Sequence, residues 1–265
     1  MLARFCSLLT RWWVSLMGLD QTSAIGRVKR RRLCLEQCEQ RVVFAGTDYV
    51  SALYWDILNR AADQSGLDAY NYQLHHGASQ EQVANSIWNS VEHRGIEVDG
   101  FYKTLLHRNA DPVGRQYYID QLRSGVSEES VMLTIATSGE YIQRNPLGEA
   151  YINALYHDVL GRDADAEGLA SWLDQLKAAD QVYSSTDTYH KDQVGVAWNF
   201  IHSHERHTQI IFGHYDKNLL RDPDPDGEAD WVNKLDQGAR EDAVALAFMT
   251  CLEYRTDYPI KSVFA

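Results

Sequence analysis

One spacing pattern recurs four times along the chain and limits what it can fold into. A tyrosine is followed after four residues by leucine and after six by arginine; an aspartate then stands three residues beyond the arginine, and a glycine six beyond it. The arginines are Arg60, Arg108, Arg162 and Arg221, the aspartates Asp63, Asp111, Asp165 and Asp224, and the glycines Gly66, Gly114, Gly168 and Gly227. Chance does not repeat several fixed offsets four times, so the chain is a tandem repeat.

Further residues extend each copy. A large aromatic and a leucine follow the arginine by ten and fourteen residues, and each copy ends in Ser-x-Glu, or Cys-x-Glu in the last. The glutamate lies 18 residues after that leucine in three copies and 29 after it in the third, which places an eleven-residue insertion there. We therefore divide the chain into an extension (1–46), three repeats (47–95, 96–146 and 147–208, the last with a loop insertion at 181–192) and a fourth repeat (209–265).

Each copy has the pattern of three helices. The first carries apolar residues at helical spacing, as in Tyr151, Ile152, Leu155 and Tyr156. The aspartate is a natural N-cap for the second helix, since its carboxylate can accept backbone N–H bonds there. The third helix follows a Gly-containing turn. The sequence thus predicts an all-α fold of four packed three-helix repeats.

The strings LLHRNADPVGRQYYIDQL, LGRDADAEGLASWLDQL and LLRDPDPDGEADWVNKL resemble the bacterial family named domain of unknown function 4214. The resemblance covers about residues 47–257. It departs from the family pattern at Asn59, His107 and Leu220, where glycine is usual before the arginine. It implies the fold group of phycobilisome linker domains and a place in secreted or surface proteins, and it implies no reaction.

The recurring charges of the copies have two interpretations. Four equivalent arginines favour a structural ion pair with the recurring glutamate or aspartate. The acidic loops of copies three and four also match the first half of a calcium loop, with Asp163, Asp165, Glu167 and Asp222, Asp224, Asp226 as candidate ligands. Position 12 of that loop lacks its glutamate in both copies, and only the third-position aspartate recurs in all four, as capping predicts. We expect no other cofactor.

The insertion is rich in Ser, Thr, Asp and Tyr, which predicts a surface loop. Tyr183 and Tyr189 would then be exposed aromatics beside hydroxyl groups, a composition suited to contact with a protein or a sugar. The alternative is a tolerated insertion without a role.

Charge is unevenly divided between the extension and the repeats. Residues 1–46 hold eight Lys/Arg and three Asp/Glu, whereas residues 47–265 hold 17 and 34. The acidic repeats argue against nucleic-acid binding. Residues 1–32 suit contact with a membrane surface, and they resemble a signal peptide only in part, because Arg11 interrupts the apolar run.

These observations favour a non-enzymatic surface or secreted module that binds a protein or surface glycan, or helps to assemble a larger structure. The alternatives are a calcium-dependent adhesion or carbohydrate-binding module and an uncharacterised enzyme. No nucleophile elbow, phosphate loop or nucleotide-binding glycine pattern supports the last. The oligomeric state stays open.

Overall fold

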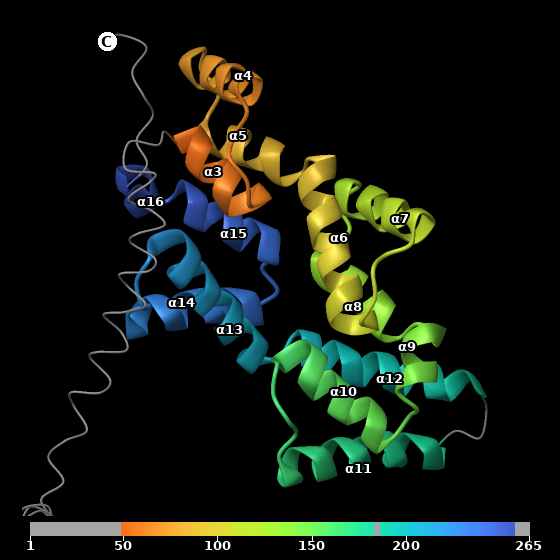
Figure 1. Ribbon diagram of the computed structural model, residues 1–265. Helices are drawn as coiled ribbons and strands as arrows, with labels where there is room; N and C mark the ends of the chain where they lie inside the picture. The colour runs from red at the N-terminus through yellow and green to blue at the C-terminus, as the bar shows by residue number, and fades with distance from the viewer. Residues whose placement is uncertain (1–48, 183–185, 258–265) are drawn as a thin grey trace, which may run out of the picture. The chain divides into compact units, whose positions relative to one another are not determined.

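A computed structural model describes residues 49–182 and 186–257, with side chains throughout that part except 177–192. The basic extension at 1–46 lies outside it. The first repeat contains α3 (Tyr49–Leu58), α4 (Gln64–His75) and α5 (Gln80–Trp88), and the second α6 (Val91–Leu106), α7 (Pro112–Arg123) and α8 (Glu128–Ala136). A short α9 (Gly139–Arg144) leads to the third repeat, which contains α10 (Glu149–Leu160), α11 (Ala166–Val182) and α12 (Thr186–Ile201). The fourth contains α13 (His204–His214), continued by the π-helix η1 (Tyr215–Leu219), then α14 (Pro225–Asp236) and α15 (Glu241–Thr250), and ends in α16 (Leu252–Asp257) (Figure 1).

The predicted fold class is confirmed: the described residues form helices and no strand, in four three-helix repeats. The side chains of Asp63, Asp111 and Asp224 cap the second helices of their copies. Ser79 and Ser127 cap third helices in the same way. Side-chain caps thus set the start of most helices, as the spacing of Asp and Ser indicates.

The Ser-x-Glu motif at the end of each copy begins a further helix, so α6 and α13 start inside copies one and three and continue into copies two and four. The hydroxyls of Ser90, Ser138 and Ser203 accept from backbone N–H groups of α6, α9 and α13. Between copies one and two, this new helix and the first helix of the following copy are a single element, α6. Between copies three and four, α13 and η1 play the same part.

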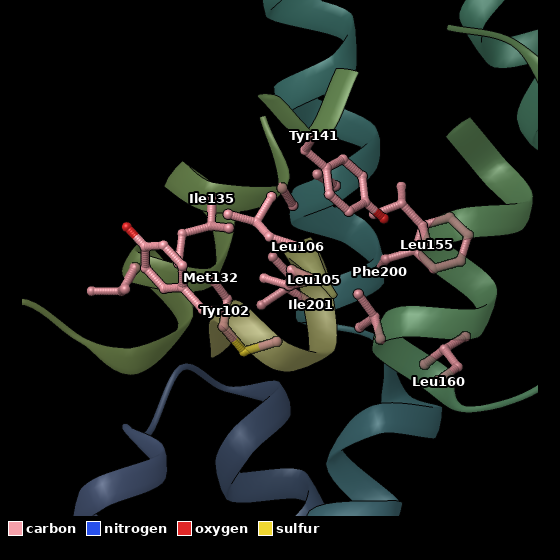
Figure 2. Packing of buried hydrophobic residues seen from close by; sticks show 14 of the residues in the cluster. Tyr102, Leu105, Leu106, Met132, Ile135, Tyr141, Leu155, Leu160, Phe200 and Ile201 are labelled. Atoms are coloured by element: carbon pink, nitrogen blue, oxygen red, sulfur yellow. The ribbon is translucent and has the colours of Figure 1, made fainter. Parts of the chain in front are cut away.

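The repeats pack in pairs that do not follow the order of the sequence. One core joins repeats two and three and includes Leu105, Ile135, Leu155 and Phe200 (Figure 2). A second core joins repeats one and four. In each pair the third helices contact one another, α8 with α12 and α5 with α15. Repeats one and two therefore correspond to repeats three and four as two equivalent halves.

The predicted loop at 181–192 is largely helix. α11 extends to Val182 and α12 begins at Thr186, so the inserted residues lengthen two helices that pack on each other. The helix propensities of Ser, Thr, Asp and Tyr lie within about 0.7 kcal/mol of alanine, which pairing with a neighbouring helix outweighs. Tyr183 lies outside the described residues, and Tyr189 belongs to α12 with its side chain outside them. A partner-binding role for both stays a prediction.

Candidate functional site

The same side-chain arrangement is built four times, and we call it the repeat node: the Tyr, Arg, Asp, Gly and Glu of one copy. In repeat three, Arg162 Nε donates to Glu205 Oε1 at 2.6 Å and its Nη2 donates to Oε2 at 2.9 Å. The guanidinium also lies over the ring of Tyr156, 4.8 Å from the centroid. The equivalent two-bond pairs are Arg60–Glu92, Arg108–Glu140 and Arg221–Glu253. Each pair ties the end of a first helix to the helix that follows the third.

The aspartate and glycine complete the node. Asp165 Oδ1 accepts from the backbone N of Gly168 at 2.7 Å, and its Oδ2 lies 3.3 Å from Arg162 Nη1. A Cβ on Gly168 would lie 2.2 Å from the Tyr156 hydroxyl, and the other three copies give 2.1 to 2.5 Å. The glycine is therefore required by the tyrosine that packs over it. This contact is the close approach that a missing side chain permits.

The residue before each arginine adopts a left-handed backbone conformation. Gly161 has φ 66°, and Asn59, His107 and Leu220 have φ 54°, 49° and 55°. The backbone therefore keeps this conformation where glycine is replaced. The conformational cost is larger for His107 and Leu220 than for Gly161 and Asn59.

The node sets the charge state of its carboxylates. Hydrogen bonds from Arg162 hold the pKa of Glu205 below its usual range, and the other node glutamates are lowered in the same way. Hydrogen bonds from Ser65 and the Gly66 backbone lower the pKa of Asp63 to about 2. The node carboxylates are therefore ionised throughout the neutral range.

The candidate calcium ligands fall into two groups. Asp165 and Asp224 belong to nodes, where each accepts from a backbone N–H and lies near an arginine. Asp163, Glu167, Asp222 and Asp226 are exposed on the flanking loop and first helical turn. In the part of the chain that the structure describes, no group of three or more His, Cys, Asp or Glu side chains is arranged to hold a metal ion.

A second charged site lies where the two halves meet, and the repeat pattern did not reveal it. Arg94, 1% exposed, pairs with Glu97 on its own helix at 2.8 Å and with Glu128 at the start of α8. Arg206, also buried, pairs with Glu241 at the start of α15. Its Nη2 lies 3.3 Å from Met132 Sδ of the other half.

Further contacts cross between the halves at this point. Arg240 Nη1 donates to Gly125 O at 2.7 Å, and the Glu241 backbone N donates to Glu129 Oε1 at 3.2 Å. The central charge cluster, as we call it, contains three arginines and five carboxylates: Arg94, Arg206, Arg240, Glu97, Glu128, Glu129, Glu241 and Asp242. It therefore carries more carboxylates than cations.

Burial shifts the pKa values of three glutamates in this cluster. It raises the pKa of Glu97 to about 7, and it also raises those of Glu128 and Glu241. Glu128 Oε2 and Glu129 Oε2 are buried without a hydrogen-bond partner among the described residues. Desolvation of the charged form is the dominant cause, and the arginines offset it only in part.

Two histidines of α13 lie against one carboxylate. His204 Nδ1 and His207 Nδ1 lie 2.7 and 2.6 Å from the two oxygens of Asp236. His202 instead stacks on Trp198, with ring centroids 3.6 Å apart. His204 and His207 thus share a face and link α13 to α14, whereas His202 does not contact Asp236 and meets the ring of His207 edge-on at 6.4 Å.

Repeat four also has a cavity of about 590 Å³. Its apolar lining includes Tyr215, Trp231 and Phe248, and its polar lining includes the Arg221–Glu253 pair, Thr256 and Asp257. The Arg–Glu pair is the one that every node contains. The polar lining residues that belong to no node are therefore Thr256 and Asp257 of α16.

The repeats and nodes define an all-helical tandem-repeat protein. Four stretches match the family model described as domain of unknown function (DUF4214), at residues 42–95, 98–145, 140–184 and 197–258. The chain belongs to this family, as the resemblance predicted. No curated protein and no solved structure matches the chain. Among the described residues, every helix is too short or too polar to cross a membrane.

Proposed function

We propose that the chain is a non-enzymatic helical repeat module that binds another protein or helps to assemble a larger structure at the cell surface or outside the cell. The support is what its recurrent polar groups already do. In each node the arginine, aspartate and glutamate bond to one another and to the backbone, so the residues that a catalytic reading would select are engaged in holding helices together. We therefore assign contact with a partner to exposed residues outside the nodes.

The observation that carries the proposal is an exposed apolar face on α7. Val113 and Tyr117 are 81% and 56% exposed and lie four residues apart, on one side of the helix. The equivalent positions on α14 are Asp226 and Asp230. Because the fold is the same in both copies while these positions differ, the fold does not require apolar residues there, and we assign this face of α7 to contact with a protein.

The test is capture of partners by the full chain. Immobilised protein is incubated with surface and secreted proteins of the producing cell, and retained proteins are purified and titrated against the chain by calorimetry. We expect Val113→Ser with Tyr117→Ser to weaken binding at least tenfold. Asp226→Ser with Asp230→Ser, the matched control, should leave it unchanged. Equal loss in both variants, or no retained protein, would count against the proposal.

The cavity of repeat four favours a second candidate, a carbohydrate-binding module. Aromatic rings beside hydroxyl and carboxylate groups suit a sugar, which presents both apolar and hydroxyl faces. A glycan array with the full chain and with Trp231→Ala tests it. Repeating the array and a thermal melt in EDTA tests the calcium-dependent version: a melting temperature lowered by EDTA in the parent but not in the Asp165→Ala, Asp224→Ala double variant would support calcium binding.

A further inference from the structure

One contact between the two halves is made twice. In repeat two, the Tyr141 hydroxyl on α9 donates to Asp158 Oδ2 on α10 at 3.0 Å, and the ring of Tyr141 meets that of Tyr151 edge-on at 5.8 Å. In repeat four, Tyr254 on α16 donates to Asp56 Oδ2 on α3 at 2.7 Å. Its ring meets Tyr49 edge-on at 6.1 Å. The end helix of repeat four thus packs on repeat one as that of repeat two packs on repeat three.

The two contacts differ in how the chain connects them. α9 and α10 are joined by four residues, 145–148, whereas Tyr254 and Asp56 are 198 positions apart. The same geometry therefore forms with a short connection and without one. Packing of side chains, not the connector, determines it.

The residues that make this contact occur in alternate copies only. Tyrosine stands three residues after the Ser or Cys cap in copies two and four, where copies one and three have His93 and Arg206. The accepting aspartate stands two residues after the node tyrosine in copies one and three, where the others have Thr104 and Lys217. The sequence thus specifies the contact at both joins between the halves 49–144 and 149–257, and at neither join inside a half.

We propose that the half-chain is an exchangeable unit, so that two copies of this chain pair by swapping halves. In the exchanged dimer, repeats one and two of one chain pack on repeats three and four of the other. Each tyrosine–aspartate contact, each pairing of third helices and the central charge cluster re-form unchanged. Only residues 145–148 change conformation, and Leu147 is the one among them that packs against the core of repeats two and three, so the cost of exchange is small. This inference names a partner for the assembly role proposed above and rests on it for its biological meaning.

The test changes the length of the connector in the full chain. Deleting Asn145 and Pro146 shortens the connector between α9 and α10 from four residues to two and keeps Leu147, which packs against the core of repeats two and three; the shorter connector should strain the return of α10 onto its own α9. We expect this variant to be a dimer of twice the 30.2 kDa chain mass, with unchanged helical circular dichroism. Inserting Gly-Ser-Gly-Ser at the same place is the matched control and should give a monomer. Light scattering after size exclusion reads both.

A second measurement uses the parent protein. Two differently tagged copies are unfolded together in urea, refolded at high concentration and purified through both tags in turn. An exchanged dimer should pass both steps and should persist on dilution until urea unfolds the helices, since its interface is the core itself. A folded monomer in the deletion variant would overturn the proposal. So would the absence of doubly tagged dimer after refolding, or a dimer that dissociates on dilution. A missing protein partner in the capture experiment would leave these results unaffected.

Discussion

The repeat node and the central charge cluster use the same residue types in opposite surroundings. In the node, Arg162 and Glu205 are about two-fifths exposed, and Arg162 also pairs with the exposed Asp165. In the cluster, Arg94 is buried and faces two carboxylates directly. Water shares the solvation of the first pair and not of the second. The half-exposed ion pairs of the nodes therefore fix the orientation of helices and contribute little to stability. In the buried cluster, removing one member leaves its partners charged and unpaired inside the protein.

The largest expected effect comes from removing the buried arginine. Arg94→Leu leaves Glu97 and Glu128 without their cation inside the protein, which should lower the free energy of unfolding by about 3–5 kcal/mol. Arg162→Leu, in a node, should lower it by about 1 kcal/mol. Urea unfolding followed by circular dichroism gives both values. Equal losses would erase the distinction between node and cluster.

The node depends on shape more than on charge. Gly168→Ala places a Cβ against the Tyr156 hydroxyl and should cost about 1–3 kcal/mol of stability. Adding Tyr156→Phe removes the hydroxyl that the new Cβ would contact and should restore part of the lost stability. Gly100→Ala, in α6 with nothing within 4 Å of the added Cβ, should instead stabilise by about 0.5–1 kcal/mol. A destabilising Gly100→Ala, or no recovery in the double variant, would contradict this account.

The two sites should also differ in their response to pH. The pKa of Glu97 is raised from 4.5 to about 7 in the folded state, so the folded state binds more protons between these values and stability falls as pH rises through them. The node glutamates have lowered pKa values, and their contribution is lost as pH falls below about 4.5. The melting temperature should therefore be highest near pH 4.5, where Glu97 is still protonated in the folded state and the node glutamates are ionised.

Glu97→Gln tests this assignment. It removes a buried charge at pH 8 and a mostly neutral group at pH 5, so the melting temperature should rise at pH 8 and change little at pH 5. Glu205→Gln is the control in the node, and it should lower the melting temperature at pH 8. The same shift for Glu97→Gln at both pH values would mean that proton binding at Glu97 does not govern the profile.

The smallest effect concerns the left-handed residue before the node arginine. Leu220→Gly relieves a side chain at φ 55° and should raise stability by about 0.5–1 kcal/mol, because glycine adopts this conformation without the Cβ clash. Gly161→Leu makes the reverse change and should lower stability by a similar amount. Thermal unfolding of the pair measures both. A loss in Leu220→Gly would show that packing of the leucine outweighs its backbone strain.

The four-copy spacing determined the fold class, the repeats and the members of the node. These features are local: an aspartate caps the helix that follows it, and the tyrosine and glycine of a node are 12 residues apart, so fixed offsets report them. Offsets also suggested that each arginine pairs with a glutamate, since both recur together. The prediction of a loop at 181–192 is wrong. The composition of this segment is typical of loops, and composition does not show that α11 and α12 pack on each other.

Only the tertiary structure decided which repeats pack together. Repeats one and four share a core although they are farthest apart in sequence, and no repeat offset encodes that distance. Arg94 looks like a surface residue in the sequence; its burial follows from the meeting of α8 and α15. The alternation of tyrosine and aspartate is visible in the sequence, but only the packing of α16 on α3 shows that these residues contact each other. Local hydrogen bonds join residues at fixed separations, so they can be predicted from spacing in the sequence. Packing between distant helices depends on surfaces that exist only once those helices have formed.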